Sequence, residues 1–123
     1  MITIDEMQAL LDDMCCELPE VFFEELNGGV NLLPDAKYNP AGRDNDLFVL
    51  GEYCNQFELG RFINLYYGSF VECFRWMPQG ELEDELRKTL RHEFRHHLEG
   101  LAGERDLELK DEAYLEQYLQ GRE

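Results

Sequence analysis

The chain has 123 residues, and 27 acidic against 11 basic residues give it a formal net charge of −16 at pH 7. This excess of negative charge argues against a nucleic-acid partner and against anionic membrane surfaces, because both bind through clustered lysine and arginine. With 44% hydrophobic residues, the length predicts a single domain, residues 1–123, that is able to build one core.

Two helices and a strand are predicted at the start of the chain. Residues 3–15 place apolar side chains at spacings of three and four between acidic ones, which predicts an amphipathic helix. Pro19 suits a first helical position, so residues 19–26 are predicted to form a short second helix that ends at the Asn-Gly-Gly turn of residues 27–29. Residues 30–33 follow as a short strand.

A loop and two further strands are predicted in the middle of the chain. Residues 35–46 are rich in turn formers and charge, which predicts an exposed loop. Residues 47–53 and 61–70 combine β-branched and aromatic side chains, which predicts two strands joined by residues 54–60. Together with residues 30–33, these segments predict a small sheet of about three strands.

A long helix is predicted for residues 81–101, which contain no proline and carry an apolar stripe at helical spacing. The stripe consists of Leu82, Leu86, Leu90, Phe94, Leu98 and Leu101. Gly100 and Gly103 are predicted to end this helix, and residues 111–119 are predicted to form a last helix that closes the domain. The predicted fold class is therefore α+β.

The long helix contains the pattern HExxH, formed by His92, Glu93 and His96. Residues four apart lie on one face of a helix, so two neutral imidazoles can bind one zinc ion at distances near 2.0–2.1 Å. Glu93 lies about 100° round the helix, from where its carboxylate can reach a water on the metal without being a ligand. The pattern predicts a zinc site in which Glu93 is the general base.

The helical wheel predicts which histidines face solvent. Relative to His92 at 0°, His96 lies at about 40°, while the leucine stripe is centred near 170°. The two predicted ligands therefore point away from the core. His97 falls at about 140°, on the apolar side, and is predicted to be a buried histidine beside the site rather than a ligand.

The third ligand is predicted among the acidic residues after the motif. Metzincins have Gly and His three and six residues after the second histidine, followed by a Met-turn. Here those positions are Glu99 and Ala102, and no methionine lies downstream, so the chain is not an ordinary metzincin. Asp106, which follows Gly103, is the preferred third ligand, and Glu99, on the same face as both histidines, is the alternative. Both also fit the plainer interpretation of ordinary members of an acidic surface.

Other side chains near the motif also have plainer structural interpretations. Tyr66 and Tyr67 are the nearest candidates to hold an oxyanion, although ordinary strand aromatics are the favoured interpretation. Arg87, Arg91 and Arg95 form a row at spacings of four, which predicts an ion-paired solvent face of the helix.

The sequence resembles the minimal, metzincin-like zinc metallopeptidases, which are small bacterial single-domain zincins whose motif resembles HExxHxxGxxD. The family's Gly and Asp fall at Glu99 and Ala102 here, and a Gly-x-x-Asp unit occurs four residues later, at Gly103 and Asp106. The short matches, in chain order, are Glu17-Leu18-Pro19, Phe22-Phe23-Glu24-Glu25-Leu26, Leu50-Gly51-Glu52-Tyr53, Ile63-Asn64-Leu65-Tyr66-Tyr67 and Leu86-Arg87-Lys88-Thr89-Leu90-Arg91-His92-Glu93.

The resemblance implies a zincin-like domain in which the motif helix packs on a small sheet, flanked by N- and C-terminal helices. It implies His92 and His96 as ligands of one zinc ion, Glu93 as the catalytic base, and a peptide or protein as substrate. The alternative expectation is a catalytically weak or inactive zincin-fold protein that acts as a metal-binding or protein-interaction module. A soluble acidic domain with fortuitous histidines is the third possibility.

A cytoplasmic location is also predicted. The first residues have neither the basic flank nor the apolar stretch of a signal peptide, and no apolar run approaches the roughly 18 residues that cross a bilayer. The four cysteines lack metal-ligand spacing and are predicted to be reduced thiols. The sequence makes no prediction of oligomeric state.

Overall fold

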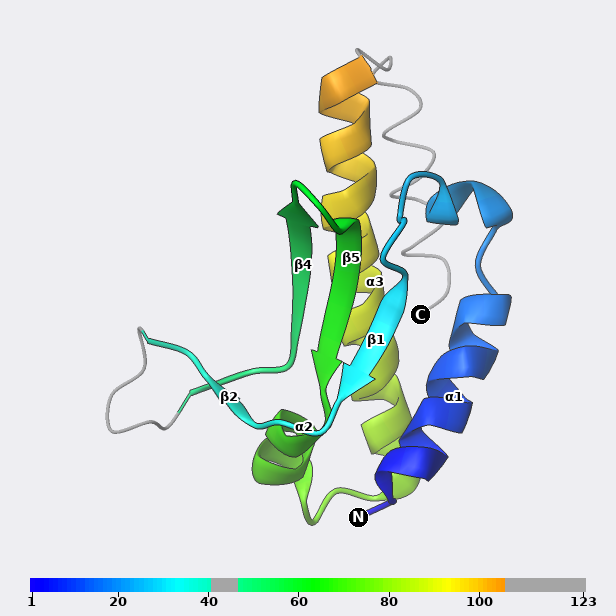
Figure 1. The fold of residues 1–123 in the computed structure, drawn as a ribbon. Helices are drawn as coiled ribbons and strands as arrows, with labels where there is room; N and C mark the ends of the chain where they lie inside the picture. Colours follow the sequence, from blue (N-terminus) through cyan, green and yellow to red (C-terminus); the bar gives the residue numbers. More distant parts are fainter. Residues whose placement is uncertain (41–46, 106–123) are drawn as a thin grey trace.

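The computed structural model describes residues 1–40 and 47–105, which form an α+β arrangement of a small mixed sheet and helices (Figure 1). The elements, in chain order, are α1 (Ile4–Cys16), the 3-10 helix η1 (Glu20–Phe23), β1 (Val30–Leu33), β2 (Lys37–Tyr38), β3 (Phe48–Val49), β4 (Gly51–Gln56), β5 (Gly60–Tyr66), α2 (Tyr67–Phe74) and α3 (Gln79–Arg105). The predicted N-terminal helix and the strand at residues 30–33 are confirmed, whereas the helix predicted for residues 19–26 is only the four-residue 3-10 helix η1.

The three longer strands form one sheet in the order β1-β5-β4. β1 pairs with β5 in parallel, with Val30 opposite Ile63, and β4 pairs with β5 antiparallel, with Tyr53 opposite Ile63. The two-residue strands β2 and β3 form a separate antiparallel pair, which extends away from the sheet on the β4 side (Figure 1). The predicted small sheet of about three strands is confirmed.

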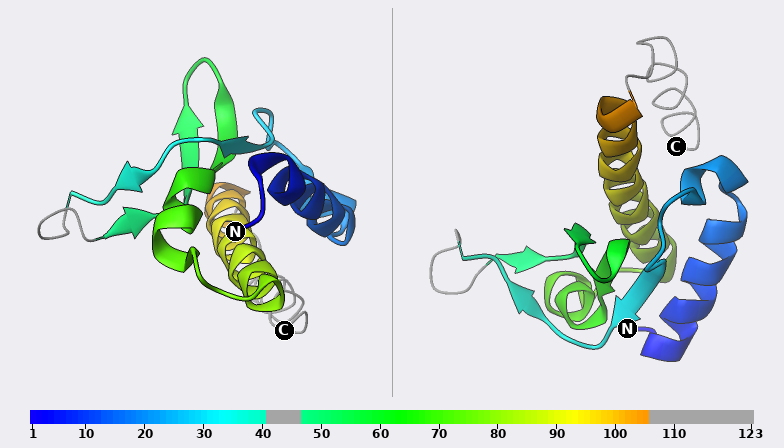
Figure 2. Two further views of the ribbon diagram at one scale, coloured as in Figure 1. Left: turned by 90° about the horizontal axis from the view of Figure 1, so that it is seen from below. Right: turned by 45° about the horizontal axis from the view of Figure 1, so that its top comes forward.

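Helix α3 lies across one face of this sheet, and α1 runs beside it on the β1 side (Figures 1 and 2). All six residues of the predicted apolar stripe are buried. Five of them, all except Leu101, belong to one hydrophobic core with the α1 side chains Met7, Leu11 and Met14 and the β5 side chains Ile63 and Leu65. Polar residues consequently occupy the face of α3 that points away from this core.

Helix α1 begins at a capping box. The N–H of Glu6 donates to the hydroxyl of Thr3 at 3.1 Å, and the N–H of Thr3 donates to the carboxylate of Glu6 at 2.8 Å. Two of the N–H groups left without partners at a helix start are satisfied in this way, which fixes the N-terminus of the helix.

Two strand predictions differ from the structure. The predicted strand 61–70 ends at Tyr66, and its last residues begin helix α2. A Cβ at Gly68 would lie 2.5 Å from the main-chain nitrogen of Ala36, so α2 sits against the backbone after β1 and tertiary packing outweighs the strand propensity of residues 67–70. In addition, the predicted strand 47–53 is divided between β3 and β4, and β4 continues to Gln56, so the connection to β5 is shorter than predicted. Residues 37–38 of the predicted loop 35–46 form β2.

Helix α3 also runs further than predicted. It continues through Gly100 and Gly103, the predicted end signals, as far as Arg105. Neither glycine would bring an added Cβ within 4 Å of another atom, and neither has a positive φ, so neither has the left-handed conformation of a helix-ending glycine. The predicted last helix, residues 111–119, lies outside the described residues. None of the helices in the described part of the chain is long and apolar enough to traverse a bilayer.

Candidate metal centre

His92 and His96 lie on the exposed side of α3, as the helical wheel predicts. Their Nε2 atoms are 3.1 Å apart, and their rings meet edge to face. Two nitrogens bound to one zinc ion at 2.0–2.1 Å in tetrahedral geometry are roughly 3.3 Å apart. The donor atoms and their spacing therefore fit two ligands of a zinc ion, and without metal the N–H of one ring can donate to the nitrogen of the other.

Glu93, which follows His92 in the motif, is buried, with 6% of its surface exposed. Its side chain packs against β4 where that strand has no side chain, since a Cβ at Gly51 would lie 3.3 Å from the Glu93 Cγ. Burial raises the pKa of Glu93, and the neighbouring Glu52 adds to this, whereas His96 and a hydrogen bond from the Tyr53 main-chain N–H act in the opposite direction. A carboxylate with a raised pKa is a stronger base near neutral pH.

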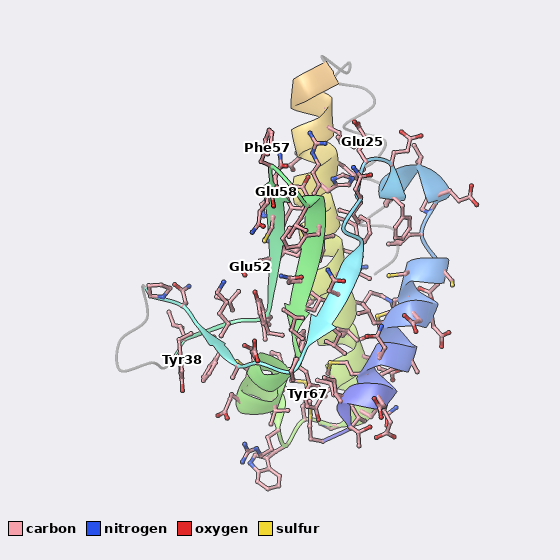
Figure 3. The ribbon with its side chains drawn as sticks, viewed as in Figure 1. Glu25, Tyr38, Glu52, Phe57, Glu58 and Tyr67 are labelled. Carbon is pink, nitrogen blue, oxygen red and sulfur yellow. The ribbon has the colours of Figure 1, made fainter. Side chains whose placement is uncertain are left out.

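His97 is fully buried, as predicted, and bonds at both ring nitrogens. Its Nε2 lies 2.8 Å from the carbonyl oxygen of Glu24, and its Nδ1 lies 2.9 Å from the hydroxyl of Tyr53. Because a carbonyl only accepts, Nε2 carries the proton and Nδ1 accepts from Tyr53. Burial lowers the pKa of His97, so the neutral ring is favoured. Glu24 belongs to the turn after η1, where Glu25 has a φ of 60° (Figure 3).

The two tyrosines considered as oxyanion holders bond elsewhere. The Tyr66 hydroxyl donates to Glu52, which also pairs with Lys37 at 2.6 Å. The Tyr67 hydroxyl donates to the carbonyl of Ile2 near the start of α1 (Figure 3). These contacts support the structural interpretation of both residues.

The arginine row differs from its prediction. Arg87 pairs with Glu17 of the segment after α1 at 3.7 Å, whereas Arg91 is only 7% exposed. The prediction of a solvent face is therefore wrong for Arg91, because this side of α3 packs close to α1 and its following turn. The spacing of the row held no information on how α1 packs against α3.

The described residues do not bring a third metal ligand to His92 and His96. Within residues 1–40 and 47–105, no group of three His, Cys, Asp or Glu side chains is placed to hold one metal ion. Asp106, the preferred third ligand, lies outside the described residues. Glu99 lies on α3 and is exposed, and its role as a ligand stays a prediction.

Tyr53 is the residue that sequence reasoning missed. Its position in a predicted strand gave no sign of a role, because its two partners, Glu93 and His97, lie about forty residues further along the chain. Only the packing of α3 on β4 brings these residues together.

Comparison with known proteins finds a related structure. No protein-family model and no curated protein matches the chain. The structure of a conserved hypothetical protein from Thermus thermophilus superposes with a TM-score of 0.72 at 37% sequence identity, and the match covers 83% of this chain and 99% of that chain.

Proposed function

The chain belongs to the same family as this conserved hypothetical protein, and we propose that it is a zinc-dependent metallopeptidase with a zincin-like fold. The observation that carries the proposal is the pair of exposed Nε2 atoms of His92 and His96, 3.1 Å apart, next to a buried glutamate of raised pKa. A helix with this motif, packed on a small mixed sheet, agrees with the family resemblance seen in the sequence.

His92 and His96 would hold the metal through their Nε2 atoms, with an acidic residue, Asp106 or Glu99, as the third ligand. A zinc ion held there would supply a water with a pKa near 7 and would polarise the carbonyl of a peptide bond. The Glu93 carboxylate accepts the proton of the attacking water and donates it to the leaving nitrogen. The burial of Glu93 favours this role, because a carboxylate with a raised pKa is a stronger base and takes the proton more readily.

The proposed substrate is a peptide or protein, and the proposed location is the bacterial cytoplasm. The cysteines in the described residues, Cys15, Cys16, Cys54 and Cys73, are free thiols, which agrees with a reducing compartment. Burial raises the pKa of Cys15 to about 11, so that thiol is a poor metal ligand or nucleophile at neutral pH.

A metal-binding or protein-interaction module without peptidase activity is the second candidate. The observation that favours it is the lack of a third ligand among the described residues. Two histidines alone bind zinc weakly and leave more positions to solvent than a catalytic site with three protein ligands.

Zinc content and peptide hydrolysis of the protein purified without a histidine tag separate these functions. We expect about one zinc ion per chain and cleavage within a peptide library. His92→Ala and His96→Ala should lose the metal, whereas Glu93→Gln should keep it and lose at least about a hundredfold in kcat.

Glu58→Gln is the matched control, because Glu58 is an exposed glutamate at the β4–β5 turn (Figure 3), and it should change neither quantity. Stoichiometric zinc without any cleavage would refute the peptidase and support the binding module. A protein that takes up no zinc would refute the peptidase and the metal-binding form of the second candidate.

A further inference from the structure

We propose that Tyr53 and His97 are positioning residues that hold Glu93 in the orientation a general base requires, an inference that rests on the proposed function. The structure links the three residues through two consecutive hydrogen-bonded contacts on one turn of α3. Glu93 accepts from the main chain of Tyr53, and His97 accepts from its hydroxyl.

The first contact uses the open edge of the sheet. The N–H of Tyr66 donates to the carbonyl of Leu50, and antiparallel strands exchange hydrogen bonds at every second pair. Glu52 and Asn64 are therefore a bonded pair, and the N–H of Tyr53 points away from β5. In the described part of the chain β4 is the edge strand of this sheet, so the Tyr53 N–H faces out of the sheet, and the Glu93 carboxylate accepts it.

The second contact fixes the other end of the same residue. Tyr53 and Gly51 lie on the face of β4 that meets α3, and His97 lies one helical turn after Glu93. The Tyr53 hydroxyl donates to His97 at 2.9 Å, and the rings are 5.4 Å apart. His97 is held in turn by the Glu24 carbonyl at 2.8 Å. One strand residue is therefore bound at its main chain and at its phenol by two residues of one helical turn.

These contacts fix the orientation of the Glu93 carboxylate, as a general base requires. One carboxylate oxygen is occupied by a fixed main-chain donor, and the carboxylate stem packs on Gly51. These two contacts restrict the rotation of the Glu93 side chain. A base held within a fraction of an ångström of its working position keeps the advantage of proximity.

Hydrogen exchange of the Tyr53 amide tests the proposal in the metal-free protein without substrate. We expect this amide to be protected although it lies at a sheet edge, because Glu93 accepts it. In Glu93→Ala its exchange should accelerate at least about tenfold. In Tyr53→Phe, which keeps the main-chain N–H, residue 53 should exchange about threefold faster or more, while the β5 amides of Ile63 and Leu65 stay unchanged.

Tyr67→Phe is the matched control, since it removes a tyrosine hydroxyl that bonds the Ile2 carbonyl instead, and it should leave the residue 53 amide unchanged. His97→Gln should reproduce the effect of Tyr53→Phe, and the double variant should add little to either. In a kinetic assay with a peptide that the protein cleaves, Tyr53→Phe should lower kcat about threefold to tenfold and should leave KM and the zinc affinity unchanged.

Two results would overturn the proposal. An unchanged Tyr53 amide in Glu93→Ala would show that the carboxylate is not its acceptor. Equal acceleration of all amides in Tyr53→Phe would show that the phenol only stabilises the fold. Failure of the zinc assay would refute the proposed function but would not alter these exchange rates, so the two failures are distinguishable.

Discussion

The buried position of Glu93 disfavours the charged form of its carboxyl group. Burial is the main cause of its raised pKa, and Glu52 contributes in the same direction. Burying a charged carboxylate lowers the stability of the fold, and groups of this kind are common in functional sites.

Glu93→Gln should therefore stabilise the metal-free protein at pH 7. The pKa of Glu93 is higher in the folded than in the unfolded chain, so its contribution to stability is complete below the unfolded value, near 4.3, and is lost as the pH rises through the folded value. Denaturant unfolding at pH 7 should give a higher midpoint for the variant, and the difference should shrink towards pH 4. Glu58→Gln should show no such pH dependence. A variant less stable than the native protein at pH 7 would contradict this account.

Much of the site could be predicted at the residue scale. The spacing of His92, Glu93 and His96 placed the two proposed ligands and the proposed base on one helix, and the wheel put His97 in the core, where it is fully buried. Tyr53 could not be predicted, because its roles depend on how β4 lies against α3. Asp106 lies outside the described residues, and Glu99 is untested as a ligand.

The contact between β4 and α3 depends on one glycine. A Cβ at Gly51 would lie 2.7 Å from Leu65 Cδ2 and 2.9 Å from Thr89 Cγ2, as well as close to Glu93. Such distances are well inside ordinary van der Waals contact, so a side chain here would force the helix and the strand apart.

Gly51→Ala should lower the free energy of unfolding by about 1–3 kcal/mol. Gly100→Ala is the matched control, because Gly100 lies in α3 with no atom within 4 Å of an added Cβ, and it should stabilise by about 1 kcal/mol. Denaturant titration of both variants measures these changes. A destabilising Gly100→Ala would mean that the helix ends at Gly100, as the sequence suggested.

At the scale of elements, regular patterns were more informative than composition. The apolar stripe of α3 and the strand at residues 30–33 were predicted correctly because each has a clear period or clear boundaries. Helix α2 was mistaken for a strand because residues 67–70 are rich in aromatics, and its backbone contact with Ala36 cannot be seen in the sequence. The glycines of α3 resemble an end signal, although no residue there needs a positive φ.

Over the whole molecule, the net charge of −16 argues against polyanionic partners but does not identify a function. Repulsion among acidic groups keeps a small domain soluble and disfavours polyanions. Within that acidic surface, α3 carries two exposed imidazoles, those of His92 and His96, beside the buried carboxylate of Glu93. The proposed activity therefore depends on one helix, on the sheet that supports it, and on a third ligand that an experiment has to identify.

Anomalous X-ray scattering at the zinc edge, from crystals of the untagged protein grown with zinc, tests the central claim most directly. The account predicts one peak per chain about 2.0–2.1 Å from the Nε2 atoms of both His92 and His96, with the carboxylate of Asp106 or Glu99 as third ligand and that of Glu93 nearby but not bound. Zinc-replete crystals without a peak between the two histidines would contradict it.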